Sequence, residues 1–209
     1  MCQLFEMIEA TGRWPESLCL GLITPLVKDD EKGLVAGNTR PITVMPLLYR
    51  AWAATRMREL IDWQETWISQ NISSYRPGLG CEDLWLTEAL RVEHSLLHGY
   101  GLVGVSLDFA KAFDRLPHGV LLHLMEEMGM DSSILRALRG MYCSLERRFK
   151  VGQHLGSSFT SSNGILQGCP ISVLLLNACV ETWARAVKEE AGPGCTPQGY
   201  ADDIGAIAF

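Results

Sequence analysis

The most informative segment of this 209-residue chain is Gly199-Tyr200-Ala201-Asp202-Asp203-Ile204, close to its C-terminal end. Two adjacent carboxylates lie between an aromatic residue and a short apolar run that extends to Phe209. This pattern predicts a tight β-hairpin with Asp202 and Asp203 at its tip. Because two like charges side by side repel each other, we expect a divalent cation to compensate them, and carboxylate oxygens are the ligands that Mg²⁺ prefers.

A third carboxylate, Asp108, follows an apolar run of strand length at residues 102–107. If this strand and the terminal hairpin lie side by side in one sheet, three carboxylates meet at one edge and form a ligand set for two Mg²⁺ ions. Each piece also has a plainer interpretation. An isolated Asp-Asp pair is usually a solvated turn, and an aspartate at a strand end is usually a turn residue or a helix cap.

The composition is ordinary for a globular protein, with 47% hydrophobic and 20% charged residues. A formal net charge of −6 argues against tight nucleic-acid binding by charge alone, although it leaves room for a local basic groove. The seven cysteines form no C-x-x-C pair, which argues against a disulfide framework or zinc site and favours a reducing intracellular compartment, nuclear or cytoplasmic. The longest apolar run, residues 171–180, is too short to span a bilayer, so no membrane partner is expected.

Hydrophobic periodicity and turn residues predict a mixture of helices and strands. Helices are expected at residues 2–10, 47–61, 82–98, 120–128, 131–143 (with Asp131 as N-cap) and 171–190, and Leu86, Leu90 and Leu97 of the third have core spacing. A strand or hairpin is expected at 18–27, with an interruption at Pro25. Further strands are expected at 102–107, as a pair within 149–159, and in the terminal hairpin. Because the two kinds of element mix without strict alternation, the expected class is α+β.

Five segments together resemble the reverse transcriptases of non-long-terminal-repeat (LINE-like) retrotransposons. Residues 107–114 (LDFAKAFD), 164–172 (GILQGCPIS) and 200–203 (YADD) resemble motifs A, B and C of that family. Upstream, Arg40-Pro41-Ile42 resembles a fingers motif, and Tyr75-Arg76-Pro77-Gly78 with Glu82-Asp83 resembles the next one. Each segment alone is weak evidence for the family, but the five together in this order are specific for it. The resemblance extends from about Leu20 to the end of the chain.

The resemblance implies a right-hand polymerase, with an antiparallel palm sheet packed on helices. Residues 1–100 would form a fingers-like part and residues 101–209 the palm, and part of 115–160 is a candidate for return to the fingers. Because the chain ends just after motif C, we expect it to lack the thumb and a lysine-bearing palm segment. In motif B, Leu166 and Val173 replace prolines that the family often has, which implies a less rigid loop.

The resemblance also implies the metal site. Asp108, Asp202 and Asp203 would be the catalytic residues and would hold two Mg²⁺ ions, for which Mn²⁺ would substitute. The carbonyl of Phe109 would be an additional ligand.

Nucleotide-binding roles carry over to five further residues. Phe113 would lie beneath the sugar and disfavour a ribose 2′-hydroxyl, Gln167 and Gly168 would contact the incoming nucleotide, and Lys28 and Arg40 would hold the triphosphate. Plainer alternatives stay open: a core position for Phe113, a surface position for Arg40, an ordinary loop amide for Gln167 and a solvated charge run around Lys28.

Two other clusters are weaker candidates for binding sites, one for a metal ion and one for nucleic acid. His94 and His98 have helical i, i+4 spacing suited to a metal, but no third ligand is evident. Residues 147–150 (RRFK) form a basic and aromatic cluster that would suit a template backbone or base, or simply an exposed strand.

The function implied by the resemblance is that of an RNA-directed DNA polymerase. It would transfer nucleotidyl groups from a dNTP to the 3′-hydroxyl of a DNA primer on an RNA template, by two-metal catalysis. Two alternatives remain open: an inactive, truncated retrotransposon relic, and a non-catalytic RNA-binding module of the same fold. The sequence does not indicate an oligomeric state.

Overall fold

The structure is a computed structural model that describes residues 2–208. The chain forms two compact units. The first unit contains the residues up to 60 together with 113–172, and the second contains 61–112 together with the residues from 173 onward. The division into fingers-like and palm parts at residue 100 stays a prediction.

Helices form the base of the first unit. They are α1 (Cys2–Thr11), the first part of α2 (Leu47–Glu65), α5 (His118–Glu127) and α6 (Ser132–Ser144). The buried Trp14, Tyr49 and Trp52 pack on one another, and the indole N–H of Trp14 donates to the Ala137 carbonyl at 2.7 Å. The predicted N-cap is confirmed, because the Asp131 side chain accepts from the backbone N–H groups of Ser133 and Ile134 in the first turn of α6.

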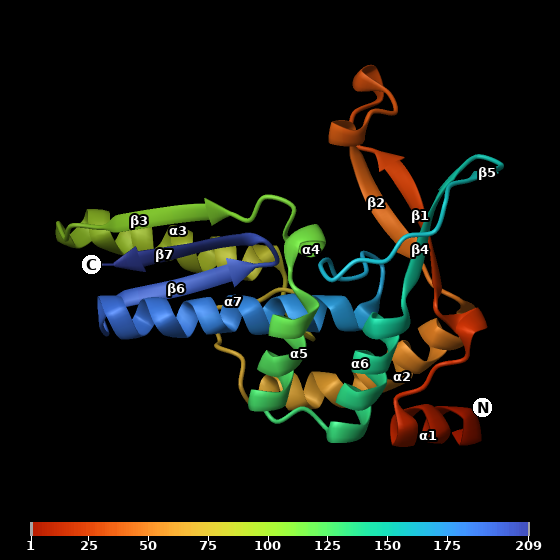
Figure 1. Cartoon of the computed structure of the whole chain (residues 1–209). Coiled ribbons are helices and arrows are strands. Elements are labelled where there is room, and N and C mark those ends of the chain that lie inside the picture. The colour runs from red at the N-terminus through yellow and green to blue at the C-terminus, as the bar shows by residue number, and fades with distance from the viewer. Residues whose placement is uncertain (1, 209) are drawn as a thin grey trace. The chain divides into compact units, whose positions relative to one another are not determined.

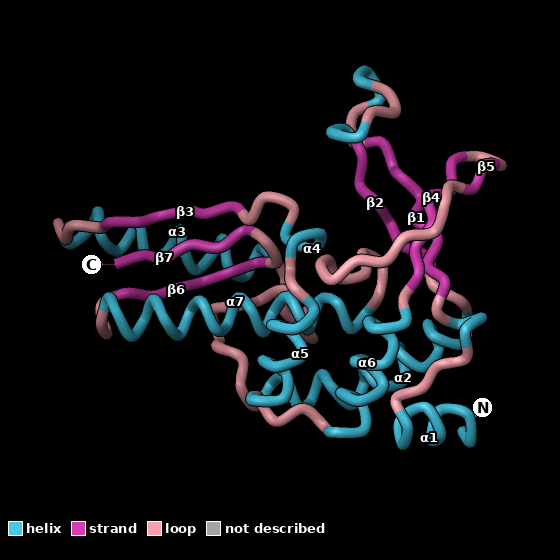
Figure 2. Tube along the Cα trace, in the orientation of Figure 1, coloured by secondary structure: helices cyan, strands magenta, loops and turns pink. Residues whose placement is uncertain are grey.

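A four-stranded sheet completes the first unit, in the order β2-β1-β4-β5 (Figure 2). Its strands are β1 (Leu20–Val27), β2 (Thr39–Val44), β4 (Glu146–Val151) and β5 (His154–Leu155). β1 pairs antiparallel with β2 and parallel with β4. Three short 3₁₀ turns, Glu16–Leu18, Asp30–Lys32 and Ala36–Asn38, lie before β1 and between β1 and β2.

The expected interruption of the first strand at Pro25 is wrong, because β1 runs through it. Pro25 lies directly opposite Pro41 of β2. Two opposed prolines fit a pair that exchanges no N–H···O bonds, since neither has a backbone donor. On its other side β1 pairs with β4 only from Leu20 to Ile23, so Pro25 removes no hydrogen bond there either.

The second unit contains a three-stranded antiparallel sheet in the order β3-β7-β6 (Figure 1). Its strands are β3 (Val103–Asp108), β7 (Asp203–Ala208) and β6 (Cys195–Tyr200). The unit also contains α3 (Cys81–His98) and most of α7 (Pro170–Ala191), whose residues Leu174, Leu175, Ala178 and Val180 are buried. The short α4 (Ala112–Arg115) lies where the chain passes from the second unit to the first.

The expected core positions on α3 are wrong. Leu86, Leu90 and Leu97 are 53%, 55% and 81% exposed. The covered side of this helix instead carries Leu84, Thr87, Glu88, Arg91 and Ser95, which share one helical face. Hydrophobic periodicity therefore does not show which face of this helix is covered by the rest of the unit.

Within residues 2–208, no helix is both long and apolar enough to cross a membrane. The cysteines at positions 19, 81, 143, 169, 179 and 195 are all free.

Candidate active site

The terminal hairpin is present, but its tip is displaced by one residue from the predicted position. Tyr200 pairs with Asp203, so the two-residue turn is Ala201-Asp202, and Asp203 is already the first residue of β7. Ala201 has a φ of 56°, the left-handed conformation that tight hairpin turns require. Asp202 therefore lies in the turn, while Asp203 has a fixed place in the sheet.

Asp108, the last residue of β3, lies directly opposite Asp203 in the antiparallel ladder. Directly opposite side chains project from the same face, with Cβ atoms ~5 Å apart. The backbone N–H of Phe109 donates to the Asp202 carbonyl at 3.3 Å, which ties the turn to the end of β3. The three aspartates are thus gathered at one end of the sheet.

This end of the sheet carries negative charge that the protein does not neutralise. Asp108 and Asp203 are exposed and Asp202 is half-buried, and within residues 2–208 none of the three carboxylates has a hydrogen-bond or ion-pair partner. Like charges directly opposite each other destabilise a ladder. Carboxylate oxygens suit a hard divalent cation, so the donor set fits Mg²⁺ in kind.

The side chains do not form a ready-made ion cage. In the described part of the chain, no three His, Cys, Asp or Glu side chains are arranged so that they could hold a metal. The ladder fixes Asp108 and Asp203 as a pair, while Asp202 is carried by the adjoining turn. The metal-ligand roles of the three aspartates stay a prediction.

The loop of residues 164–169, in the first unit, is anchored at Gln167 and Gly168. The Gln167 side-chain Nε2 donates to Asp114 Oδ1 at 3.0 Å, and its carbonyl accepts from the backbone N–H of Thr43 at 2.9 Å. Gly168 has a φ of 106°, and a Cβ there would lie 3.4 Å from the Thr43 carbonyl oxygen. The loop therefore lies against β2, and the Gln167 amide is oriented by a carboxylate.

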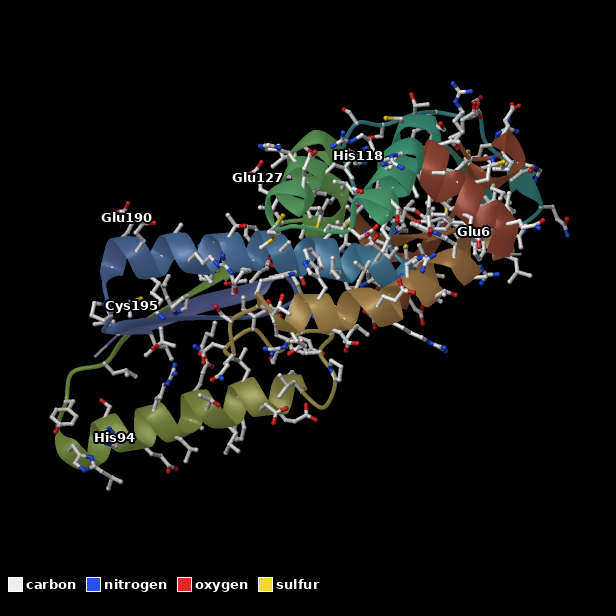
Figure 3. All side chains as sticks on the ribbon, turned by 90° about the horizontal axis from the view of Figure 1, so that it is seen from below. Glu6, His94, His118, Glu127, Glu190 and Cys195 are labelled. Atoms are coloured by element: carbon white, nitrogen blue, oxygen red, sulfur yellow. The ribbon has the colours of Figure 1, made fainter. Side chains whose placement is uncertain are left out.

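The base of the same loop is held by the side chains of His118 and Arg147. The Gly164 carbonyl accepts from His118 Nε2 at 2.8 Å and from Arg147 Nη2 at 2.7 Å. Since a carbonyl can only accept, His118 carries its proton on Nε2. Burial lowers the pKa of His118 and also that of Arg147. Figure 3 shows His118 on α5.

The other residues predicted to contact the nucleotide are exposed or half-buried. Arg40 lies opposite Leu26 in the β1–β2 pair, and Lys28 follows the end of β1; both side chains are exposed and have no partner within residues 2–208. Phe113 is half-buried in α4, and its carbonyl accepts from the Ile165 N–H at 2.7 Å. Phe109, with Asp108, Asp202 and Asp203, lies in the second unit, whereas Lys28, Arg40, Phe113, Gln167 and Gly168 lie in the first.

A protein-family model described as reverse transcriptase (RNA-dependent DNA polymerase) matches residues 27–208. The chain belongs to the reverse transcriptase family. The resemblance of the five ordered segments to that family is thereby confirmed.

Curated relatives of this reverse transcriptase chain are retrotransposon proteins. It is 25% identical over 212 residues to the "Retrovirus-related Pol polyprotein from type-2 retrotransposable element R2DM" of Drosophila melanogaster, covering 98% of the chain and 20% of that protein. It is 29% identical over 210 residues to the "Transposon TX1 uncharacterized 149 kDa protein" of Xenopus laevis, covering 94% of the chain and 16% of that protein. The chain thus spans about a fifth or less of the length of these relatives.

Solved structures show the same fold. A telomerase from Candida Tropicalis with a TWJ fragment of telomeric RNA gives a TM-score of 0.66 at 12% identity, over 99% of this chain and 39% of that one. A Sicinivirus 3Dpol RNA-dependent RNA polymerase gives a TM-score of 0.51 at 18% identity, over 98% and 43%. The predicted α+β, right-hand polymerase fold is confirmed.

The two weaker clusters are resolved differently within this reverse transcriptase chain. The rings of His94 and His98 stack on each other at 4.2 Å, and no third metal-binding side chain joins them within residues 2–208. Arg147 is engaged by Gly164, while Phe149 stacks on Phe159 at 5.7 Å with 46% of its surface exposed. A template contact at this cluster stays a prediction.

Sequence reasoning missed two residues, Asp114 and Tyr75, whose side chains contact residues of the predicted motifs B and C. Asp114 closes the motif A segment and orients Gln167, and Tyr75 opens the Tyr75-Arg76-Pro77-Gly78 segment and stacks on Tyr200. Both lie inside motifs that the sequence singled out, but the partners are far away along the chain. Only the fold shows which residue each one contacts.

Proposed function

We propose that this chain carries the nucleotide-addition site of an RNA-directed DNA polymerase. The reaction would transfer a nucleotidyl group from a dNTP to the 3′-hydroxyl of a DNA primer paired to an RNA template. The observation that best supports it is the placement of Asp108 opposite Asp203, with Asp202 in the adjoining turn, in a chain of the reverse transcriptase family.

The carboxylates of Asp108, Asp202 and Asp203, with the Phe109 carbonyl beside them, would hold two Mg²⁺ ions or Mn²⁺ in their place. When bound, such ions stabilise the attacking and leaving oxygens of an in-line phosphoryl displacement. The contribution of the chain is to fix oxygen donors at one end of a paired sheet, so that little rearrangement is needed when charge develops.

The residues proposed to contact the nucleotide are Lys28, Arg40, Phe113, Gln167 and Gly168. Arg40 offers a planar fork for triphosphate oxygens and Lys28 a point charge, and neither is occupied by a protein partner within residues 2–208. Because Asp114 accepts from Gln167 Nε2, the Gln167 side-chain oxygen is left to accept a hydrogen bond. Phe113 would fill the space beside the sugar.

Primer extension on an RNA template with Mg²⁺ tests the proposal. The chain, and the full-length product wherever its gene encodes more, should extend a DNA primer, and Asp203→Asn should reduce the rate by about a hundredfold or more, as loss of a transition-state electrostatic contact does. Asp62→Asn, an exposed aspartate on α2, is the matched control and should extend normally. Equal extension by Asp203→Asn and wild type would contradict the proposal, and extension by neither would favour a relic or an RNA-binding module.

A further inference from the structure

A short segment of the second unit, residues 71–76, lies along the edge of β6 that β7 leaves open. The Gly199 N–H donates to the Asn71 carbonyl at 3.0 Å, and the Ser73 N–H donates to the Gly199 carbonyl at 3.1 Å. Ile72 and Gly199 thereby form an isolated parallel bridge. We call residues 71–76 the clip segment, because it pairs with β6 three residues before Asp202.

Tyr75 of the clip segment has an unusual backbone conformation. Its φ is 54°, and only two other described non-glycine residues have positive φ, Lys111 and the turn residue Ala201. For a bulky side chain this conformation is strained, and it persists only where the surrounding structure enforces it. The residues on either side of Tyr75 must therefore hold its backbone in this conformation.

The two neighbours of Tyr75 are each tied to a helix. The buried Ser74 hydroxyl donates to Asn177 Oδ1 at 2.6 Å, and Asn177 Nδ2 donates back to the Ser74 carbonyl at 2.9 Å. On the other side, Arg76 pairs with Glu65 at 2.5 Å and donates to the Ile72 carbonyl at 2.8 Å. With both flanking residues held, the backbone that carries the Tyr75 side chain is held in place.

The Tyr75 side chain contacts the β6–β7 hairpin, which carries Asp202 and Asp203. The Tyr75 ring stacks on the ring of Tyr200, with centroids 6.5 Å apart and planes 22° apart. Burial, then Tyr200 and Asp202, raise the pKa of the Tyr75 phenol, which agrees with a position close to both residues. Within residues 2–208 its hydroxyl makes no hydrogen bond, so the contact is made by the ring alone.

We infer that Tyr75 is a positioning residue, whose ring braces Tyr200 and so holds the Ala201-Asp202 turn and Asp203 in register with Asp108. Tyr200 pairs with Asp203 and immediately precedes the turn, so a movement of Tyr200 displaces both carboxylates together. The role in holding the hairpin is independent of catalysis, whereas its consequence for the reaction rests on the proposed function.

Hydrogen–deuterium exchange tests the brace directly. In Tyr75→Ala, the amides of residues 200–204 should exchange about tenfold faster than in wild type, because local opening of the hairpin becomes easier. Tyr75→Phe keeps the ring and should stay within about twofold of wild type at the same amides. Unchanged exchange in Tyr75→Ala would overturn the inference, and so would acceleration in Tyr75→Phe equal to that in Tyr75→Ala.

Tyr100→Ala is the matched control. Tyr100 is another exposed tyrosine of the second unit, at 58%, and it stacks on His98 rather than on the hairpin. Its removal should leave residues 200–204 unchanged, and α5 should exchange equally in all variants, which shows that they are folded. Should Tyr75→Ala alter α5, Tyr75→Leu tests the same point with apolar bulk retained: faster exchange at residues 200–204 supports the brace, and no change overturns it.

Extension kinetics distinguish this inference from the proposed function. Tyr75→Ala should lower kcat by about tenfold while KM for the dNTP stays within about twofold, because the misplaced groups act on the transition state. Tyr75→Phe should restore kcat. If wild type does not extend a primer, the proposed function fails, while the exchange result still decides whether Tyr75 holds the hairpin.

Discussion

At the scale of single residues, the candidate site depends on pairs that are distant in sequence. Asp108 is placed by Asp203, Gln167 by Asp114, and Tyr200 by Tyr75. The sequence predicted that the three aspartates meet at one end of a sheet, and the structure places them there, while their metal-binding role stays a prediction. Asp114 and Tyr75 could not be predicted, because their importance arises from contacts that only the folded chain creates.

Asp114→Ala should release the Gln167 amide without touching the aspartates of the hairpin. Loss of one hydrogen bond to a charged acceptor costs about 1.5–3 kcal/mol, and the exposure of this one places the effect at the lower end. We expect KM for the dNTP to rise by about tenfold with kcat nearly unchanged. Steady-state extension kinetics measure this; Asp30→Ala, in an exposed turn, should change neither constant, and an unchanged KM in Asp114→Ala would contradict the role of Asp114.

His118 should make stability depend on pH. Burial lowers its pKa in the folded state, so the unfolded chain binds the proton more readily. Its contribution is therefore present above its unfolded pKa of about 6.5 and is lost as pH falls below that value toward the folded pKa. Thermal unfolding from pH 7.5 to 5 should show this decline. Arg147 and Tyr142 face the ring but keep their charge states over this range.

His118→Gln should flatten the pH dependence and, by loss of the bond to Gly164, lower stability by about 1 kcal/mol at pH 7.5. For a chain of this size that corresponds to a Tm lower by about 2–4 °C. His123→Gln, an exposed histidine on the same helix, should leave the wild-type profile. A His118→Gln profile as steep as the wild-type profile would assign the pH dependence to other groups.

At the scale of elements, helix and strand types followed the sequence well, and the failures have identifiable causes. Pro25 does not break β1, because it faces Pro41 and lacks a second partner strand. The leucines of α3 were predicted to be buried but are exposed. The prediction failed because hydrophobic periodicity shows which residues share a helical face but not which face other elements cover. The turn lies at Ala201-Asp202 and not at Asp202-Asp203, because Asp203 pairs with Tyr200 on one side and with Asp108 on the other.

Gly199 should be intolerant of any side chain, because β6 approaches α7 closely there. A Cβ at Gly199 would lie 2.9 Å from Val180 Cγ1 and 3.3 Å from Ile204 Cγ2. We expect Gly199→Ala to destabilise the chain by about 1–3 kcal/mol, as overpacking of a core does. Thermal unfolding of Gly199→Ala with and without Val180→Ala decides the cause. Partial recovery in the double variant is expected, and additive losses would contradict a clash with Val180.

At the scale of the whole molecule, five short motifs in order predicted the family, which the match of the family model over residues 27–208 confirms. They did not predict how the chain divides. Lys28, Arg40, Gln167 and Phe113 belong to one compact unit and the three aspartates to the other, and both units are assembled from two stretches of chain. Such interleaving reflects long-range packing, which no local pattern records.

Divalent metal should stabilise the whole chain through the aspartates. A ligand at a hundred times its Kd adds about 2.7 kcal/mol, so saturating Mn²⁺ should raise Tm by about 5–10 °C. Asp202→Asn combined with Asp203→Asn should abolish the rise. Asp29→Asn with Asp30→Asn, the other adjacent pair, is the matched control, and an equal rise in both double variants would place the metal elsewhere.

Whether Asp203 holds a metal ion during nucleotide addition can be tested by changing the metal that its side chain prefers. Asp203→Cys replaces a hard oxygen ligand with a thiolate, which prefers softer cations to Mg²⁺. Single-nucleotide extension should fall by about a hundredfold or more in Mg²⁺, and Mn²⁺ should recover about tenfold of that loss relative to wild type in the same ion. Equal losses in Mg²⁺ and Mn²⁺ would contradict direct metal binding by Asp203, and full activity in Mg²⁺ would place the site elsewhere.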